Sequence, residues 1–166
     1  MNEEQVELVI NSICSNDLNS IKEFVNANKD QIDSVTMFGT MLQIASREGK
    51  MDISKYLIDR GADVNIGGGF ADSAMIDAVV QGHFDMVKLL LSHGAILDTS
   101  TFTANALFTA ISGGYPDIAK YLIDQGIDLA AAYHIGKIEN CDALEYARQY
   151  GQMEIYDYIK ESLHKD

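Results

Sequence analysis

One short pattern recurs along this chain at nearly constant intervals and limits the folds that it can adopt. Its clearest copy runs from Gly82 to Ala95 and reads GHFDMVKLLLSHGA, with apolar residues at helical spacing between two glycines. Similar segments begin at Gly49 and Gly114, 33 residues before and 32 residues after Gly82. A period of about 33 residues is typical of a unit built from a turn and two short helices. We therefore expect an array of such units.

The residues of this pattern resemble the motif of the ankyrin repeat family. The family's G-H-x-x-x-V-x-x-L-L-x-x-G-A half is matched almost position for position by Gly82, His83, Val87, Leu90, Leu91, Gly94 and Ala95. Residues 61–65 read GADVN and match the family's G-A-D-V-N ending. The resemblance implies an all-α fold, an ankyrin-repeat solenoid of about five helix-turn-helix repeats with short hairpin-like finger loops. In this family the finger tips and the exposed side of the first helices line a concave groove that binds a partner.

We expect residues 1–166 to form a single ankyrin-repeat domain. The repeats are expected at approximately 1–33, 34–66, 67–98, 99–130 and 131–166, with the first and the last acting as caps. Good N-cap residues recur before the first helix of each later repeat, namely Thr40, Ser73, Asn105 and Asp142. The finger before Asp142 carries about five extra residues within 130–140, and insertions in repeat proteins often lie on the binding side. A surface bulge without a binding role is the alternative.

Charge restricts the partners. The chain has 12 basic and 25 acidic residues and a net charge of −13. Nucleic acid and anionic membranes would repel such a surface. A basic protein is favoured, through steering more than through raw affinity, although acidity that serves only solubility is the alternative. The sequence has no apolar run of about 18 residues and no positively charged leader at its start, and it has only two cysteines, which favours a reducing cytoplasm.

The glycine run and the histidines are the residues to consider as phosphate or metal sites. Residues 67–69 are a run of three glycines, but the Lys-Ser/Thr of a phosphate-binding loop does not follow, so a hairpin tip is expected. The four histidines show no H-E-x-x-H pattern, so no metal site is expected. His83 is expected to bond a loop carbonyl of a neighbouring repeat.

Candidate catalytic groups are few. Cys14 is expected to be part of the core. Cys141 lies before a helix N-terminus, where a thiol pKa can fall, but no histidine is beside it in sequence. Asp72 and Asp77 lie five residues apart and straddle a turn, so they do not share one helix face. We therefore predict that the protein is not an enzyme and needs no cofactor, metal or small-molecule substrate.

Carried onto the frame of the family, the finger tips hold large apolar residues. Met37, Phe70 and Phe102 fall in one column, with Ile138 or Glu139 at the next finger. Exposed side chains of this size are unfavourable unless a partner covers them, so we interpret them as interface anchors inside an acidic rim that includes Asp77. The alternative is that they fold under and pad the hairpin stack. The predicted protein-binding residues are Met37, Glu48, Phe70, Asp72, Asp77, Gln81, Phe102, Ile138, Glu139 and Tyr150.

The sequence therefore favours a non-enzymatic protein-protein interaction module whose concave finger and first-helix surface binds a protein partner, with a basic partner expected. An alternative is a bacterial immunity or inhibitor protein that neutralises a cognate toxin, because small acidic ankyrin-like proteins resemble the immunity proteins of toxin systems. A small-ligand-binding or enzymatic protein is the remote alternative.

Overall fold

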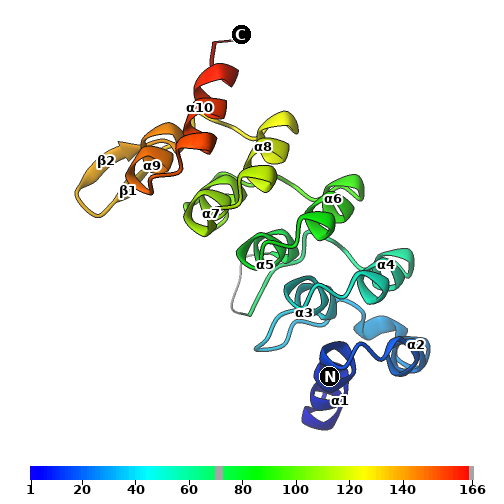
Figure 1. The fold of residues 1–166 in the computed structure, drawn as a ribbon. Helices are drawn as coiled ribbons and strands as arrows, with labels where there is room; N and C mark the ends of the chain where they lie inside the picture. Colours follow the sequence, from blue (N-terminus) through cyan, green and yellow to red (C-terminus); the bar gives the residue numbers. More distant parts are fainter. Residues whose placement is uncertain (70–72, 165–166) are drawn as a thin grey trace. The chain divides into compact units, whose positions relative to one another are not determined.

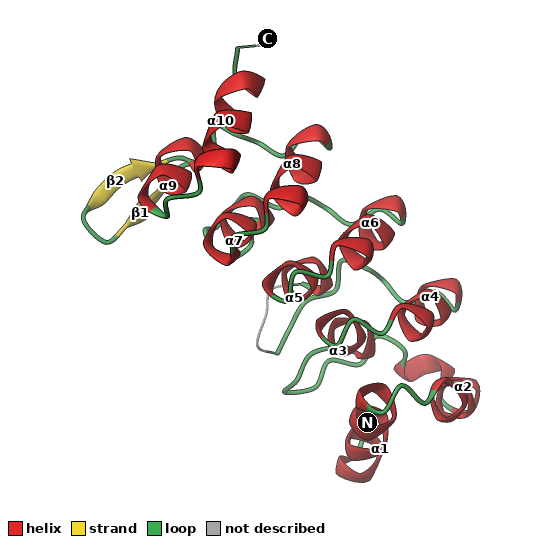
Figure 2. Cartoon of the chain, in the orientation of Figure 1, coloured by secondary structure: helices red, strands yellow, loops and turns green. Residues whose placement is uncertain are grey.

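The computed structural model describes residues 1–69 and 73–164, and these residues are mainly helical (Figure 1). They form ten α-helices, one short 3-10 helix and one two-stranded antiparallel sheet (Figure 2). The chain divides into two compact units, residues 1–96 and 97–166. None of the described helices is both long and apolar enough to cross a membrane.

Unit 1 consists of helix-turn-helix pairs. Its elements are α1 (Glu3–Cys14), α2 (Leu18–Ala27), the 3-10 helix η1 (Lys29–Gln31), α3 (Met41–Arg47), α4 (Met51–Asp59), α5 (Ala74–Val80) and α6 (Phe84–Ser92). The first helices of the pairs pack in a row, with α3 between α1 and α5, and each second helix covers its own first helix. The core between them holds Ile13, Met41, Leu57 and Leu90, which are fully buried or nearly so.

Unit 2 repeats this arrangement and adds a hairpin. Its elements are α7 (Ala106–Gly113), α8 (Pro116–Asp124), β1 (Tyr133–Ile135), β2 (Ile138–Cys141), α9 (Ala143–Gln149) and α10 (Met153–Ser162). Helix α7 packs against α8 and α9, and α10 packs against α8 and α9. The extra residues predicted within 130–140 form most of the hairpin, in which Tyr133 pairs with Cys141 and Ile135 with Ile138.

The predicted N-caps are confirmed. The side chains of Ser73, Asn105 and Asp142 each accept a hydrogen bond from a backbone N–H in the first turn of the following helix. Thr40 goes further, because its hydroxyl accepts from the Gln43 N–H while the Gln43 side-chain oxygen accepts from the Thr40 N–H. This reciprocal pair satisfies two backbone donors that the helix itself cannot satisfy. The caps therefore fix where each finger ends and each first helix begins.

His83 lies as expected, whereas Cys14 does not. His83 does bond a neighbouring carbonyl, since its Nε2 lies 3.1 Å from the backbone oxygen of Arg47 at the end of α3. Cys14 is exposed, so the prediction that it belongs to the core is wrong. The buried stripe of α1 is formed by Val9 and Ile13, and Cys14 is turned about 100° away from Ile13 on the helix.

The glycine run of residues 67–69 is explained by close packing. The Gly68 carbonyl accepts a hydrogen bond of 2.9 Å from the side-chain amide of Gln43. Gly69 has a φ of +69°, and a Cβ atom there would collide with the backbone of Phe38 and Gly39. These contacts hold the finger that contains residues 67–69 against the preceding one, and no P-loop sequence follows.

We predict that Gly69→Ala lowers the free energy of unfolding by more than about 2 kcal/mol, because it combines left-handed backbone strain with a backbone collision. The matched control is Gly94→Ala in the same unit, where φ is +85° but nothing lies within 4 Å of the added Cβ. The control should lose only about 1 kcal/mol. Urea denaturation followed by circular dichroism measures both, and equal losses would contradict the packing role of Gly69.

Candidate protein-binding surface

The finger of residues 34–39 in unit 1 is a tight turn that holds Met37 at its tip. The backbone groups of Thr36 and Gly39 bond each other in both directions, at 3.1 and 3.0 Å. The Thr36 hydroxyl accepts from the Phe38 N–H at 3.1 Å and donates to the Gly39 carbonyl at 2.8 Å. Met37 points away from these contacts and is 71% exposed. Its position agrees with the predicted exposed finger tip.

Asp77 is not part of an exposed rim, so that part of the prediction is wrong. Its side chain is only 5% exposed, and one carboxylate oxygen accepts a 2.7 Å hydrogen bond from Arg47 Nε. Burial raises the pKa of Asp77, and the Arg47 guanidinium and the Gln43 amide partly oppose that rise. The reason is the direction of α5, whose first turn faces α3 and places Asp77 against Arg47.

Arg47 connects three parts of unit 1. Besides its ion pair to Asp77 on α5, its terminal amino group donates to the Phe38 carbonyl in the finger, at 3.2 Å. Its own backbone carbonyl faces His83. The Arg47–Asp77 pair therefore fixes the base of the finger to the first helices, and the role of Asp77 is to position the finger.

The remaining unit 1 predictions lie at helix ends. Glu48 and Gln81 are the C-caps of α3 and α5, and both are exposed. They are accessible to a partner, on equivalent positions of consecutive first helices. Phe70 and Asp72 lie outside the described residues.

Phe102 in unit 2 differs from Met37. It is half-buried and makes edge contacts with the rings of Phe108, Tyr133 and Tyr146, at centroid distances of 5.6, 5.9 and 5.6 Å. The Tyr133 hydroxyl donates to the Thr99 carbonyl at 2.7 Å and so holds β1 over the cluster. The expectation that Phe102 is an exposed anchor is therefore wrong, because the longer finger supplies an aromatic ring that covers it.

The other predicted residues of unit 2 lie at its surface. Tyr150 is 51% exposed, and its ring centroid lies 4.5 Å from that of the buried Tyr146. Burial and the hydrogen bond to Tyr150 raise the pKa of Tyr146, so that phenol stays neutral. On β2, Ile138 is half-buried and Glu139 is exposed. The aromatic side chain of Tyr150 and the acidic side chain of Glu139 are therefore both accessible from solvent.

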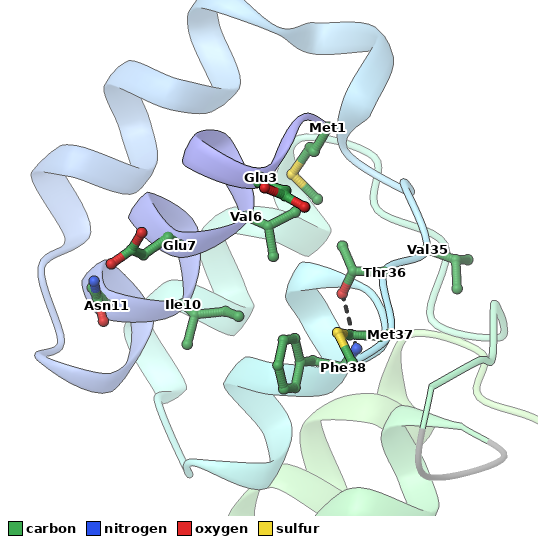
Figure 3. Close-up of a pocket in the computed structure, with 10 residues that line it drawn as sticks. All are labelled: Met1, Glu3, Val6, Glu7, Ile10, Asn11, Val35, Thr36, Met37 and Phe38. Carbon is green, nitrogen blue, oxygen red and sulfur yellow. Dashed lines mark hydrogen bonds between the residues drawn. The ribbon is translucent and has the colours of Figure 1, made fainter.

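Sequence reasoning missed a groove in unit 1 between α1 and the finger. It encloses about 490 Å³, and Val6 and Ile10 of α1 face Met37 and Phe38 of the finger across it (Figure 3). The available signal was the width of the apolar stripe on α1. Val6, Val9, Ile10 and Ile13 are all apolar residues of α1 at helical spacing, but of these four only Val9 and Ile13 are buried, whereas Val6 and Ile10 remain partly exposed.

The environments of Cys141 and Asp77 do not favour the reactivity that a catalytic thiol or carboxylate needs. Burial, assisted by the nearby carboxylates of Glu145 and Asp142, raises the pKa of the Cys141 thiol, which disfavours the reactive thiolate. Asp77 is held by Arg47. Across residues 1–69 and 73–164, the side chains of His, Cys, Asp and Glu form no group of three that could hold a metal ion.

Comparison with known proteins agrees with the helix pairs and their caps. A model of ankyrin repeats in three copies matches residues 9–101, more than half of the chain. The chain belongs to the ankyrin repeat family. It is 42% identical over 67 residues to the mouse protein phosphatase 1 regulatory subunit 27, which covers 40% of this chain and 44% of that protein.

Two further relatives extend the comparison. The chain is 29% identical over 102 residues to mouse protein fem-1 homolog A-like, covering 61% of this chain and 16% of that protein. It is 26% identical over 156 residues to a putative ankyrin repeat protein of fowlpox virus, covering 89% of this chain and 19% of that protein. The matched segments thus span less than half the length of these relatives.

We predict that Arg47→Ala lowers the free energy of unfolding by about 3 kcal/mol at neutral pH, because it leaves the Asp77 carboxylate buried without a cation. Adding Asp77→Asn should recover part of the loss, which a double-mutant cycle measures. Because the pKa of Asp77 is raised in the folded state, protonation removes the unpaired charge, and the loss should shrink as the pH falls toward 4. A loss that does not change with pH would contradict this assignment.

The two finger positions should differ in stability. Phe102→Ala should lower the free energy of unfolding by about 2 kcal/mol, somewhat less than for a fully buried phenylalanine. Met37→Ala should change it by less than about 0.5 kcal/mol, because its side chain contacts little. Chemical denaturation of both variants tests this, and similar losses would show that the two tips have the same environment.

Proposed function

We propose that this protein is a non-enzymatic interaction module that binds a basic protein partner through the finger and first-helix surfaces of its units. Membership of the ankyrin repeat family supports protein binding, since domains of this kind commonly bind other proteins. The surface predicted from the sequence supplies exposed contacts of suitable chemistry, among them Met37 and Tyr150. We also propose that each helix pair is one repeat, which makes five in the chain.

The observation that carries the proposal is the excess of acidic residues, 25 against 12 basic ones. Glu48 and Glu139 are exposed at predicted contact positions, on α3's end and on β2. Such charges accelerate encounter with a basic partner and discriminate against acidic proteins.

Several lysines lie on the second helices, where acidic or aromatic side chains engage them. Lys88 pairs with Asp85 at 2.6 Å, and Lys120 pairs with Glu154 at 2.7 Å. Lys22 lies over the ring of Tyr56.

Two first helices carry an arginine each, and both arginines pair with a carboxylate, Arg47 with Asp77 and Arg148 with Glu145. Lys137 lies exposed in the turn between β1 and β2. Acidic residues still outnumber basic ones on the first helices, which favours that surface as the face for a basic partner.

A narrower version of this function is inhibition. The name of the mouse relative describes a regulatory subunit of a phosphatase. An acidic binder that covers a basic enzyme or toxin would inhibit it, as an immunity protein does, and the negative charge favours such a partner.

We also propose a cytoplasmic location. The exposed Cys14 and the buried Cys141 are both free thiols, which fits a reducing compartment.

The test is affinity capture with the full chain, followed by measurement of association rates for the captured protein. Glu48→Lys and Glu139→Lys should each slow association by about threefold or more and weaken its dependence on salt. The control is Glu23→Lys on α2, an exposed acid outside the predicted surface. An acidic partner, or association that salt does not slow, would refute the proposal.

A further inference from the structure

The groove in unit 1 has two apolar walls. One is α1, which contributes Val6 and Ile10, and the other is the finger, which contributes Val35, Met37 and Phe38 (Figure 3). Val35 is 54% exposed and Met37 is 71% exposed. Two neighbouring apolar side chains that remain this exposed beside a hollow of about 490 Å³ indicate a surface that another molecule covers.

The rim of the groove is acidic. Glu3 and Glu7 line it from α1, four residues apart and therefore on one row of the helix, and both are exposed. None of the described lining residues has a basic side chain, and neither glutamate forms an ion pair within the described part of the chain. A cation of a bound molecule would therefore find two carboxylates on the same side of the apolar floor.

The backbone of both walls is already hydrogen-bonded. Helix α1 uses its backbone groups internally, and in the finger Thr36 and Gly39 bond each other. The Phe38 N–H donates to Thr36 Oγ1, and the Phe38 carbonyl accepts from Arg47. The walls therefore offer few free backbone groups with which an extended peptide could pair as an added strand. Recognition has to use side chains, as it does when a helix lies in a groove.

We propose that this groove binds an amphipathic helix of the protein partner, with apolar residues at i, i+3 or i+4, and i+7 and with Lys or Arg on both flanks. The inference rests on the proposed function and specifies both the place and the shape of the bound segment. The wall from Glu3 to Asn11 is about 12 Å long, which accommodates about two turns of such a helix. The apolar residues would contact Met37, Val6 and Ile10, and the basic flanks would face Glu3 and Glu7.

The probe is a peptide selected on the full chain from a display library of amphipathic helices, half with Lys and Arg flanks and half with Glu flanks. Selection should yield peptides with basic flanks. The dissociation constant of the selected peptide should rise by about tenfold or more for Met37→Asp. Ile96→Asp is the matched control, because it adds the same charge at another apolar residue of unit 1, 67% exposed and outside the groove lining. It should change the constant less than about twofold.

The rim has its own matched pair. Glu7→Lys should weaken the selected peptide by about tenfold, whereas Glu4→Lys, an exposed position on the same helix outside the lining, should have a much smaller effect. Circular dichroism of the variants verifies that they fold. Selected peptides with acidic flanks, or equal effects within either pair, would overturn the helix-binding proposal.

Different outcomes would refute the groove inference and the proposed function. If the natural partner captured by the full chain binds Met37→Asp and the parent chain equally well, the groove is not its site, although protein binding stands. If helical peptides bind the groove but no natural basic partner is captured, the groove inference stands and the proposed function is refuted.

Discussion

Burial of the first helices between their neighbours is the constraint on which the rest of the structure depends. Six consecutive residues of α3, from Met41 to Ser46, are buried, and so are six of α5, from Ala74 to Val79. Helix α3 cannot be stable by itself, because its buried surface is covered only when α1, α4 and α5 are packed around it. Small residues such as Ala45 and Ala78, both fully buried, let the helices approach closely. The order of the fingers therefore depends on the packing of the first helices that they precede.

Close packing forces buried polar groups to find partners, and unit 1 uses them to hold its fingers. Thr40 and Gln43 close the cap of α3, and Gln43 also reaches the Gly68 carbonyl. Arg47 neutralises Asp77 and binds the Phe38 carbonyl. Each of these bonds satisfies a group that would otherwise be buried without a partner, which is strongly unfavourable. The same bonds fix the finger so that Met37 is exposed to solvent, and the network that stabilises unit 1 therefore also sets the position of the finger tip.

The two fingers that carry Met37 and Phe102 show how tertiary context changes the role of equivalent positions. Met37 is 71% exposed, whereas Phe102 is covered by Tyr133 from the longer finger of unit 2. The sequence places a large apolar residue at the equivalent position of both fingers. Whether the residue in unit 2 is exposed or covered depended on a side chain about 30 residues away in sequence, a distance close to one repeat.

The sequence by itself determined the repeated helix pairs, their N-caps at Thr40, Ser73, Asn105 and Asp142, and the acidic charge, because spacing, capping chemistry and composition are local properties. Only the tertiary structure decided which of the predicted contact residues are exposed and which are buried. It turned Asp77 inward onto Arg47, and it left Val6 and Ile10 lining an open groove. Such outcomes depend on which neighbour covers a given helix face, and that neighbour is brought close by stacking, which no local pattern encodes.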